Sequence, residues 1–401
     1  MREMKDSGVE WIGEIPKEWK ICRLKNYAYI MNGADFKDIQ DDNGDYPVIG
    51  SGGEFDRATK YLYDGESVLL GRKGTIDKPR YINGTFWTVD TMYYTKIKDI
   101  GIAKYLYYLC TQIQFDYYQY GSAVPSMTQR DLNSVVFPLP EIVEQENIVN
   151  YLDSKCSKID GIIEKQQAII EKLKEYKLSI ITEVVTSGIN PDVEMKDSGS
   201  VWFGSIPINW KMKRLKYVFH IQKDIAGEEG HTVLSITQRG IIPKDFSNNE
   251  GQFANSYANY QLVHKGDFAM NHMDLLTGWV DISKYEGVTS PDYRVFVLND
   301  KNGMCPEYYL YMMQMCYSAR IFYGLGQGVS GMGRWRLQAD KFLNFHIPVP
   351  PYDEQKIIAD YITDKVNHIE VEIDKRNKLV ERYQEYKKSL IYEVVTGKKE
   401  V

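Results

Sequence analysis

The sequence has little cysteine, and its cysteines form no pattern. Five are spread over 401 residues, no two make a Cys-x-x-Cys pair, and none lies at metal-ligand spacing from a histidine. We therefore expect a reduced, cytoplasmic protein without a structural zinc. We expect all five to be packing residues: Cys22, Cys110, Cys156, Cys305 and Cys316.

Long hydrophobic runs are also missing. No stretch approaches the roughly 18 consecutive apolar residues of a membrane-spanning helix. The first residues, MREMKDSGVEWIGEIPKEW, have neither the apolar core nor the small-residue cleavage site of a secretory signal. We expect neither a membrane span nor a signal peptide.

The motifs of an enzyme are missing too. There is no Walker A loop and no Asn-Pro-Pro-aromatic motif, and the six histidines are scattered. Residues 326–331 have the G-x-G-x-x-G spacing but follow a helical pattern rather than a strand. Residues 191–196 have the letters of a PD…ExK nuclease site, compressed into a linker. Because an enzyme needs a cofactor or an activated group, we predict no catalytic, cofactor or metal site in this chain.

The charge balance argues against a polycation that coats nucleic acid. Lys and Arg number 49 against 55 Asp and Glu, for a net charge of −6. The acid is concentrated in residues 141–194, with 11 acidic and 6 basic side chains, whereas 21–137 sum to −1 and 212–347 to +1. A basic face on either near-neutral segment remains possible. Weak overall attraction to DNA would then make assembly with partners necessary.

A chain of this length exceeds one hydrophobic core, and it contains a tandem duplication. Residues 4–25 match 195–216 at 14 of 22 positions, at an offset of 191. Two further pairs match at an offset of 210: 137–155 with 347–365, and 175–186 with 385–396. Each copy therefore has an aromatic N-terminal hook, a variable middle, a Pro-x-Pro stop and a final segment. The second middle carries about 19 extra residues.

The two final segments, 142–187 and 353–397, have apolar residues at alternating three- and four-residue steps over several heptads. This pattern predicts two long helices with a coiled-coil seam. The prolines before them mark their starts, and Gly188 and Gly397 mark their ends. We expect the helices to pack antiparallel, so that a pseudo-two-fold axis relates the copies.

This organisation resembles the DNA-specificity subunit of Type I restriction–modification systems over the whole chain. The resemblance rests on SGVEWIGEIPKEW and its copy SGSVWFGSIPINW, the boundaries PLPEIVEQ and PVPPYDEQ, and the two closing helices. It implies an α+β fold with two target recognition domains in tandem, each a mostly antiparallel twisted sheet with helices. The long helices would separate these domains and dock methyltransferase subunits.

We divide the chain accordingly into four parts. They are a first recognition domain (1–140, hook 4–22), a first spacer helix (141–190), a second recognition domain (191–350, hook 195–213) and a second spacer helix (351–401). Within the domains, the pattern predicts strands at 46–53, 66–74 and 86–97, and helices at 102–120 and 306–325.

Polar residues in loops are the candidates for DNA contact. Arg and Lys recognise guanine edges or phosphates, Asn and Gln suit adenine, and Asp suits a cytosine amine. For each of them, a solvated turn is the alternative. The candidates are Ser51, Gly52, Arg72, Lys73, Lys78, Arg80, Ser122 and Ser126 in the first domain, and Asn271, His272, Asp274, Ser290, Tyr293, Gln327, Arg334 and Arg336 in the second.

The resemblance implies double-stranded DNA, two methyltransferase subunits and possibly two restriction subunits as partners. S-adenosylmethionine would bind the methyltransferase subunits, and ATP and Mg the restriction subunits. Candidate docking residues on the helices are Glu144, Gln145, Ile162, Leu173, Glu354, Gln355, Ile369 and Tyr383. The near-neutral middles leave an alternative open: a non-catalytic coiled-coil scaffold with two protein-binding α+β modules.

Overall fold

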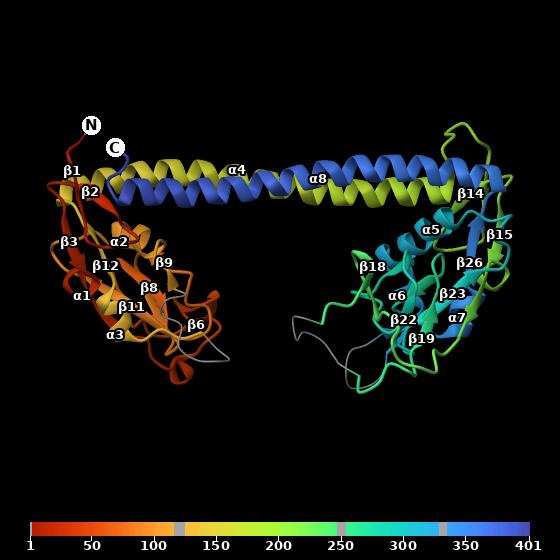
Figure 1. Ribbon diagram of the computed structural model, residues 1–401, viewed down its shortest axis with the longest axis horizontal. Helices are drawn as coiled ribbons and strands as arrows, with labels where there is room; N and C mark the ends of the chain where they lie inside the picture. Colours follow the sequence, from red (N-terminus) through yellow and green to blue (C-terminus); the bar gives the residue numbers. More distant parts are fainter. Residues whose placement is uncertain (1, 116–124, 247–253, 329–334) are drawn as a thin grey trace. The chain divides into compact units, whose positions relative to one another are not determined.

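The computed structural model describes residues 2–115, 125–246, 254–328 and 335–401. The chain divides into two compact units (Figure 1). The first unit comprises Met1–Gln167 with Asn377–Val401, and the second comprises Ala168–Arg376. The long helices α4 (Ile142–Ser187) and α8 (Tyr352–Val395) each cross this division, so each contributes to both units. Within the described ranges, no helix is both long and apolar enough to cross a membrane.

The two hooks repeat in structure as they do in sequence. In each, a short antiparallel hairpin places a methionine opposite a proline: β1 (Met4–Asp6) pairs with β2 (Glu14–Pro16), and β13 (Met195–Asp197) pairs with β14 (Ser205–Pro207). The next strand then pairs with the strand before the long helix: β3 (Lys20–Arg23) with β12 (Val136–Leu139), and β15 (Lys211–Arg214) with β26 (His346–Val349). Each hook is therefore tied to the start of a long helix.

Each variable middle contains a four-stranded antiparallel sheet. In the first unit the order is β4 (Ala28–Asn32), β11 (Met92–Ile97), β8 (Ser67–Gly71), β9 (Arg80–Ile82). In the second it is β16 (Phe219–Gln222), β23 (Arg294–Leu298), β20 (Phe268–Met270), β21 (Val280–Ile282). A parallel pairing joins β5 (Tyr46–Gly50) to β10 (Thr85–Thr88). The predicted α+β fold with mostly antiparallel sheets is confirmed.

Smaller elements complete the two units. The other strands are β6 (Gly53–Ala58), β7 (Tyr63–Asp64), β17 (Leu234–Thr237), β18 (Gly240–Pro243), β19 (Gln261–Val263), β22 (Gly287–Thr289), β24 (Gln327–Gly328) and β25 (Trp335–Arg336). The short helices are α1 (Leu24–Tyr27), α2 (Ala103–Cys110), α3 (Gln129–Ser134), α5 (Pro306–Ser318), α6 (Ile321–Leu325) and α7 (Ala339–Asn344), with 3₁₀ turns at Lys37–Ile39 and Leu215–Tyr217.

Three predicted elements differ from the structure. The single strand expected at 86–97 is two strands, β10 and β11, because the chain turns where Met92 N donates to Val89 O (2.9 Å). The helix expected at 102–120 ends at Cys110 within the described residues. The helix expected at 306–325 is broken into α5 and α6 at Arg320, whose φ of 58° is left-handed.

The predicted long antiparallel helices are confirmed. In the first unit, the beginning of α4 packs on the end of α8, and Lys387 Nζ lies 2.6 Å from Asp160 Oδ2. In the second unit, the end of α4 packs on the beginning of α8, and Lys177 Nζ lies 2.6 Å from Glu370 Oε1. Apolar residues of both helices enter the core of each unit. The apolar heptad residues therefore pack both against the other long helix and against the recognition domains.

A buried tyrosine fastens each recognition domain to both long-helix segments. Tyr105 Oη on α2 donates to Pro138 O (3.1 Å) and Val395 O (3.4 Å). Tyr308 Oη on α5 donates to Pro348 O (3.0 Å) and Val185 O (3.3 Å). In each unit, the tyrosine hydroxyl therefore links the segment that precedes one long helix to the last turn of the other long helix.

Glycines end both long helices for two physical reasons. Gly188 and Gly397 have φ of +77° and +74°, a left-handed conformation that other residues adopt with strain. A Cβ on Gly397 would also lie 2.3 Å from Pro16 Cδ, whereas one on Gly188 would lie 3.4 Å from a Trp210 ring carbon. The end of α8 is therefore packed against the first hook so closely that a methyl group has no room.

We predict that Gly397→Ala destabilises the first unit by about 2–4 kcal/mol, through left-handed strain and overpacking. Gly161→Ala is the control, because Gly161 lies within α4 and a Cβ there would have no neighbour within 4 Å. This change should stabilise the protein by about 0.5–1 kcal/mol, since alanine is the better helix former. Urea unfolding followed by circular dichroism measures both. Equal stabilities for the two variants would contradict the close packing.

Candidate nucleic-acid interface

The loop after β8 is the best-formed candidate for DNA contact in the first unit. A Cβ on Gly71 would lie 2.4 Å from Thr75 O, so the turn needs glycine. Arg72 N donates to Thr91 O (2.8 Å), and Arg72 O accepts from Met127 N (3.0 Å). Lys73 forms a β-bridge with Ser126. Backbone bonds thus hold the loop, and the Lys73 side chain is exposed to solvent.

Other predicted residues of the first unit lie near this loop. Lys78 is exposed, and Arg80 begins β9 after the same loop. A Cβ on Gly53 would lie 3.4 Å from Arg80 Nη1, so the structure brings the 51–53 turn, which includes Ser51 and Gly52, against this guanidinium. Residues 35–60 carry seven acidic and three basic side chains, however. Such a segment repels phosphates, so loop 71–80 is the better candidate for the DNA backbone.

The second unit has the same arrangement with different side chains. His272 O accepts from Leu337 N (2.9 Å), as Arg72 O accepts from Met127 N. Arg294 Nη2 donates to Leu337 O (2.8 Å), whereas Tyr93 Oη makes the corresponding, longer bond to Met127 O (3.5 Å). The structure therefore places His272 at the position of Arg72. Arg294, at the position of Tyr93, was missed by the sequence analysis because its neighbours in β23 are apolar.

Burial affects the pKa values of both His272 and Arg294. His272 is 5% exposed, and burial, followed by the charges of Arg294 and Arg336, lowers its pKa to about 3. Burial also lowers the pKa of Arg294 to about 10, so this group stays charged and its guanidinium carbon lies 4.9 Å from the centre of the Phe342 ring. His272 is neutral near pH 7. Its side chain lies beneath the surface, unlike that of Lys73.

The remaining candidates of the second unit occupy defined turns. Asn271 Oδ1 accepts from Met273 N, and Asp274 Oδ1 accepts from Leu276 N and Thr277 N, so both close a tight turn. Ser290 O and Tyr293 O accept from the buried Gln261 Nε2. Gln327 pairs with Arg336 between β24 and β25. Two further candidates, Ser122 and Arg334, lie outside the described residues.

Four of the residues predicted to dock partners hold the units together internally. Trp19 Nε1 donates to Glu144 Oε2 (2.8 Å), and Trp210 Nε1 donates to Glu354 Oε1 (3.0 Å). Gln145 and Gln355 are buried, and their Nε2 atoms donate to Pro140 O and Pro350 O, both at 3.0 Å. Gln145 Oε1 also accepts from Tyr27 Oη (2.7 Å), and Gln355 Oε1 from Cys305 N (3.0 Å). These side chains fix where each long helix begins.

The other four lie along the helix seam. Ile369 is 7% exposed in the core of the second unit, and Leu173 packs against that core. Tyr383 packs against the core of the first unit, and Ile162 is half-buried. Their accessible surface is limited, so any partner must reach the helices beside them.

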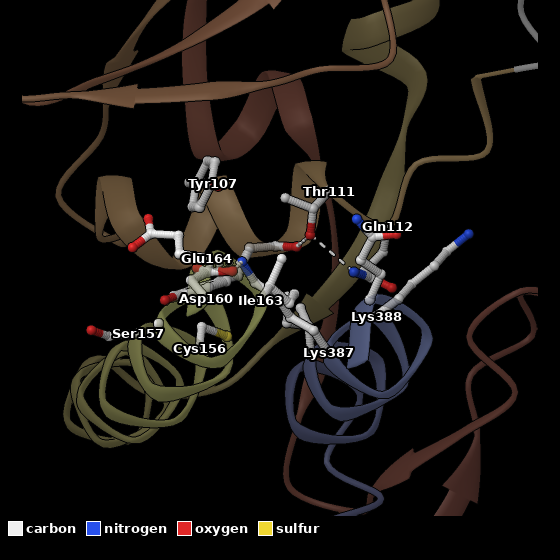
Figure 2. Close-up of a pocket in the computed structure, with 14 residues that line it drawn as sticks. Tyr107, Thr111, Gln112, Cys156, Ser157, Asp160, Ile163, Glu164, Lys387 and Lys388 are labelled. Carbon is white, nitrogen blue, oxygen red and sulfur yellow. Dashed lines mark hydrogen bonds and ion pairs between the residues drawn. The ribbon is translucent and has the colours of Figure 1, made fainter. Parts of the chain in front are cut away.

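A cavity beside the seam of the first unit offers such access (Figure 2). It has a volume of about 770 Å³ and lies between both long helices and the end of α2, where Tyr107 of α2 and Thr111, which follows α2, line it. The ion pair of Asp160 and Lys387 lines it. A second cavity, of about 470 Å³, lies between α5 and α4 in the second unit and includes Lys177. Since Lys177 corresponds to Lys387 at the 210 offset, the repeat carries a cavity at the same place in both units.

The described residues contain no group of three or more His, Cys, Asp or Glu side chains that could hold a metal ion. All five cysteines are buried. Burial raises the pKa of the Cys110 thiol to about 12, so this thiol is protonated near neutral pH.

We predict that Trp210→Phe destabilises the second unit by about 2–4 kcal/mol, because it removes a hydrogen bond to a carboxylate and leaves a cavity. The matched control is Trp202→Phe in the same hook, where the side chain is 42% exposed rather than fully buried. That change should alter the free energy of unfolding by less than about 0.5 kcal/mol. Thermal or urea unfolding provides the comparison, and a larger loss for Trp202→Phe would refute the role of the Trp210–Glu354 bond.

Comparison with known proteins agrees with this geometry. The family model described as "Type I restriction modification DNA specificity domain" matches residues 16–175 and 207–382, one match in each copy of the repeat. The chain is 24% identical to the Type I restriction enzyme MjaVIII specificity subunit of Methanocaldococcus jannaschii, over 96% of this chain and 93% of that protein. It is 22% identical to the Type I restriction enzyme EcoDI specificity subunit of Escherichia coli, over 71% of this chain and 61% of that protein.

A solved structure shares the fold. It comes from work on complex assembly and conformational transition of the type I R-M system, and it matches with a TM-score of 0.67 at 12% identity, over 96% of this chain and 99% of that chain. The repeated hooks, the paired long helices and the two matches of the family model lead to one conclusion: this chain belongs to the family of Type I restriction–modification DNA specificity subunits.

Proposed function

We propose that this chain is the sequence-recognising subunit of a Type I restriction–modification complex, and that each recognition domain contacts one half of a split DNA target. The observation that carries the proposal is the duplicated loop. Arg72 and His272 occupy equivalent positions and accept equivalent backbone bonds, from Met127 and Leu337, on a scaffold that repeats throughout. One structural solution is thus used twice with different side chains.

The side chains at the two loops support recognition of different bases. Arg72 and Lys73 can donate to the O6 and N7 acceptors of guanine or to phosphates. The second loop has an amide at Asn271 instead, which suits adenine, while the neutral His272 lies beneath the surface. Because the chemistry differs between the domains, the two half-sites should differ in sequence.

The long helices supply the second part of the proposal, which is assembly. Two methyltransferase subunits would dock on them, one at each of the equivalent cavities lined by Lys387 and Lys177. A cavity that recurs once per repeat supports one methyltransferase subunit per unit. Restriction subunits would join through these partners.

The chain itself would be non-catalytic and would act in the cytoplasm, where chromosomal DNA is available. S-adenosylmethionine would be bound by the methyltransferase subunits, and ATP and Mg by restriction subunits. This division of labour agrees with relatives that are named specificity subunits.

We predict that the double variant Arg72→Ala/Lys73→Ala, in the complex with its methyltransferase subunits, binds target DNA about 10–100-fold more weakly and still assembles. Both side chains lie on a backbone-held loop, so folding should be preserved. Fluorescence anisotropy on target and unrelated duplexes measures affinity, and size-exclusion chromatography measures assembly. Lys244→Ala in the second unit is a charge control. Intact DNA binding with lost assembly would favour the protein scaffold instead.

A further inference from the structure

The first unit contains a basic cavity that the recognition loop does not include. It has a volume of about 450 Å³ and lies between α3 and the place where β3 passes directly into α1. Its lining consists of three cations, two amides and a hydroxyl, without a carboxylate: Arg23, Lys25, Gln129, Arg130, Asn133 and Ser134. A concave site of this composition attracts an anion.

The cations of this cavity are available. Arg23, Lys25 and Arg130 are exposed, and none forms an ion pair with a carboxylate of the described residues. A fourth cation adds to the positive field, since Lys98 Nζ donates to Lys25 O (2.7 Å). Gln129 Nε2 donates to Ile30 O (2.6 Å) and fixes the first turn of α3. The position of Arg130 is therefore set by the fold, while its charge is left unpaired.

The cavity lies close to the recognition loop along the chain. Ser126 bridges Lys73, and α3 begins three residues later, after its cap at Thr128. Arg130 follows Ser126 by four positions in the chain, so their Cα atoms are at most about 14 Å apart. That distance corresponds to about four base-pair steps of about 3.4 Å along one DNA strand. One duplex can thus contact both places.

The repeat shows which part of the cavity is particular to the first unit. Arg23-Leu24-Lys25 recurs as Arg214-Leu215-Lys216. The counterpart of Arg130 at the 210 offset is Asp340, and Arg214 Nε donates to His346 Nε2 (3.3 Å). The second unit therefore has a carboxylate where the first has a guanidinium.

We propose that Arg23, Lys25 and Arg130 bind backbone phosphates of the DNA that flanks the bases contacted by loop 71–80, and that they contribute affinity without sequence preference. The inference rests on the proposed recognition of DNA by this chain. It assigns to the first unit a phosphate-binding site that the second unit lacks. Exposed, unpaired cations suit phosphates, whose contacts position a protein on DNA without selecting a sequence.

The test measures DNA affinity of the complex with methyltransferase subunits as a function of salt, for target and unrelated duplexes. We expect Arg130→Ala to reduce the slope of log K against log salt by about 0.9. Raising the salt from 50 to 200 mM should then cost the variant about 3.5-fold less affinity than it costs the wild type. Affinity for target and unrelated DNA should fall by the same factor.

Two further variants act as controls. Arg130→Lys keeps the charge and should keep the slope, while Lys216→Ala removes a charge at the equivalent place in the second unit and should leave the slope unchanged. An unchanged slope for Arg130→Ala would overturn the proposal, as would a loss confined to target DNA, which would indicate base contact. Lost assembly would also overturn it and assign the cavity to an acidic partner segment. Absence of sequence preference in the wild-type complex would instead refute the recognition function itself.

Discussion

The hook tryptophan joins the beginning of one long helix to the end of the other, and the rest of each unit depends on this junction. Trp19 donates to Glu144 at the start of α4, and its ring packs against Gly397 beyond the end of α8. Trp210 makes the same bond to Glu354, and its ring packs against Gly188. A carboxylate in the first turn of a helix also interacts favourably with the helix dipole. The first unit therefore needs two separate stretches of the chain, Met1–Gln167 and Asn377–Val401, whereas the second unit is the continuous stretch Ala168–Arg376.

This junction explains why the scaffold is repeated while the middles differ. The hook and the helix end fit most closely in the first unit, where a Cβ on Gly397 would lie 2.3 Å from Pro16 Cδ. In loop 71–80 the close fit is confined to Gly71, and backbone bonds, such as those accepted by Arg72 and His272, hold the recognition loops. A loop can therefore change its side chains, and with them its DNA preference, without disturbing the helices.

The sequence was most informative where structure is local. Heptads, prolines and terminal glycines placed both long helices within about two residues, because helical periodicity and capping act over short distances. The sequence was uninformative where tertiary contacts determine the local structure. No glycine or proline marks the turn at Val89 in the sequence. The break between the helices at Arg320 requires a left-handed backbone conformation, which an arginine does not predict. The internal bonds of Gln145 to Tyr27 link residues 118 apart, which no local pattern contains.

The central claim is that the two recognition domains act independently on two half-sites. The most direct measurement replaces residues 21–137 with the corresponding domain of another specificity subunit and sequences the methylated motif of cells that carry the complex. If the domains act independently, one half of the motif changes and the other half stays the same. A change in both halves would contradict it.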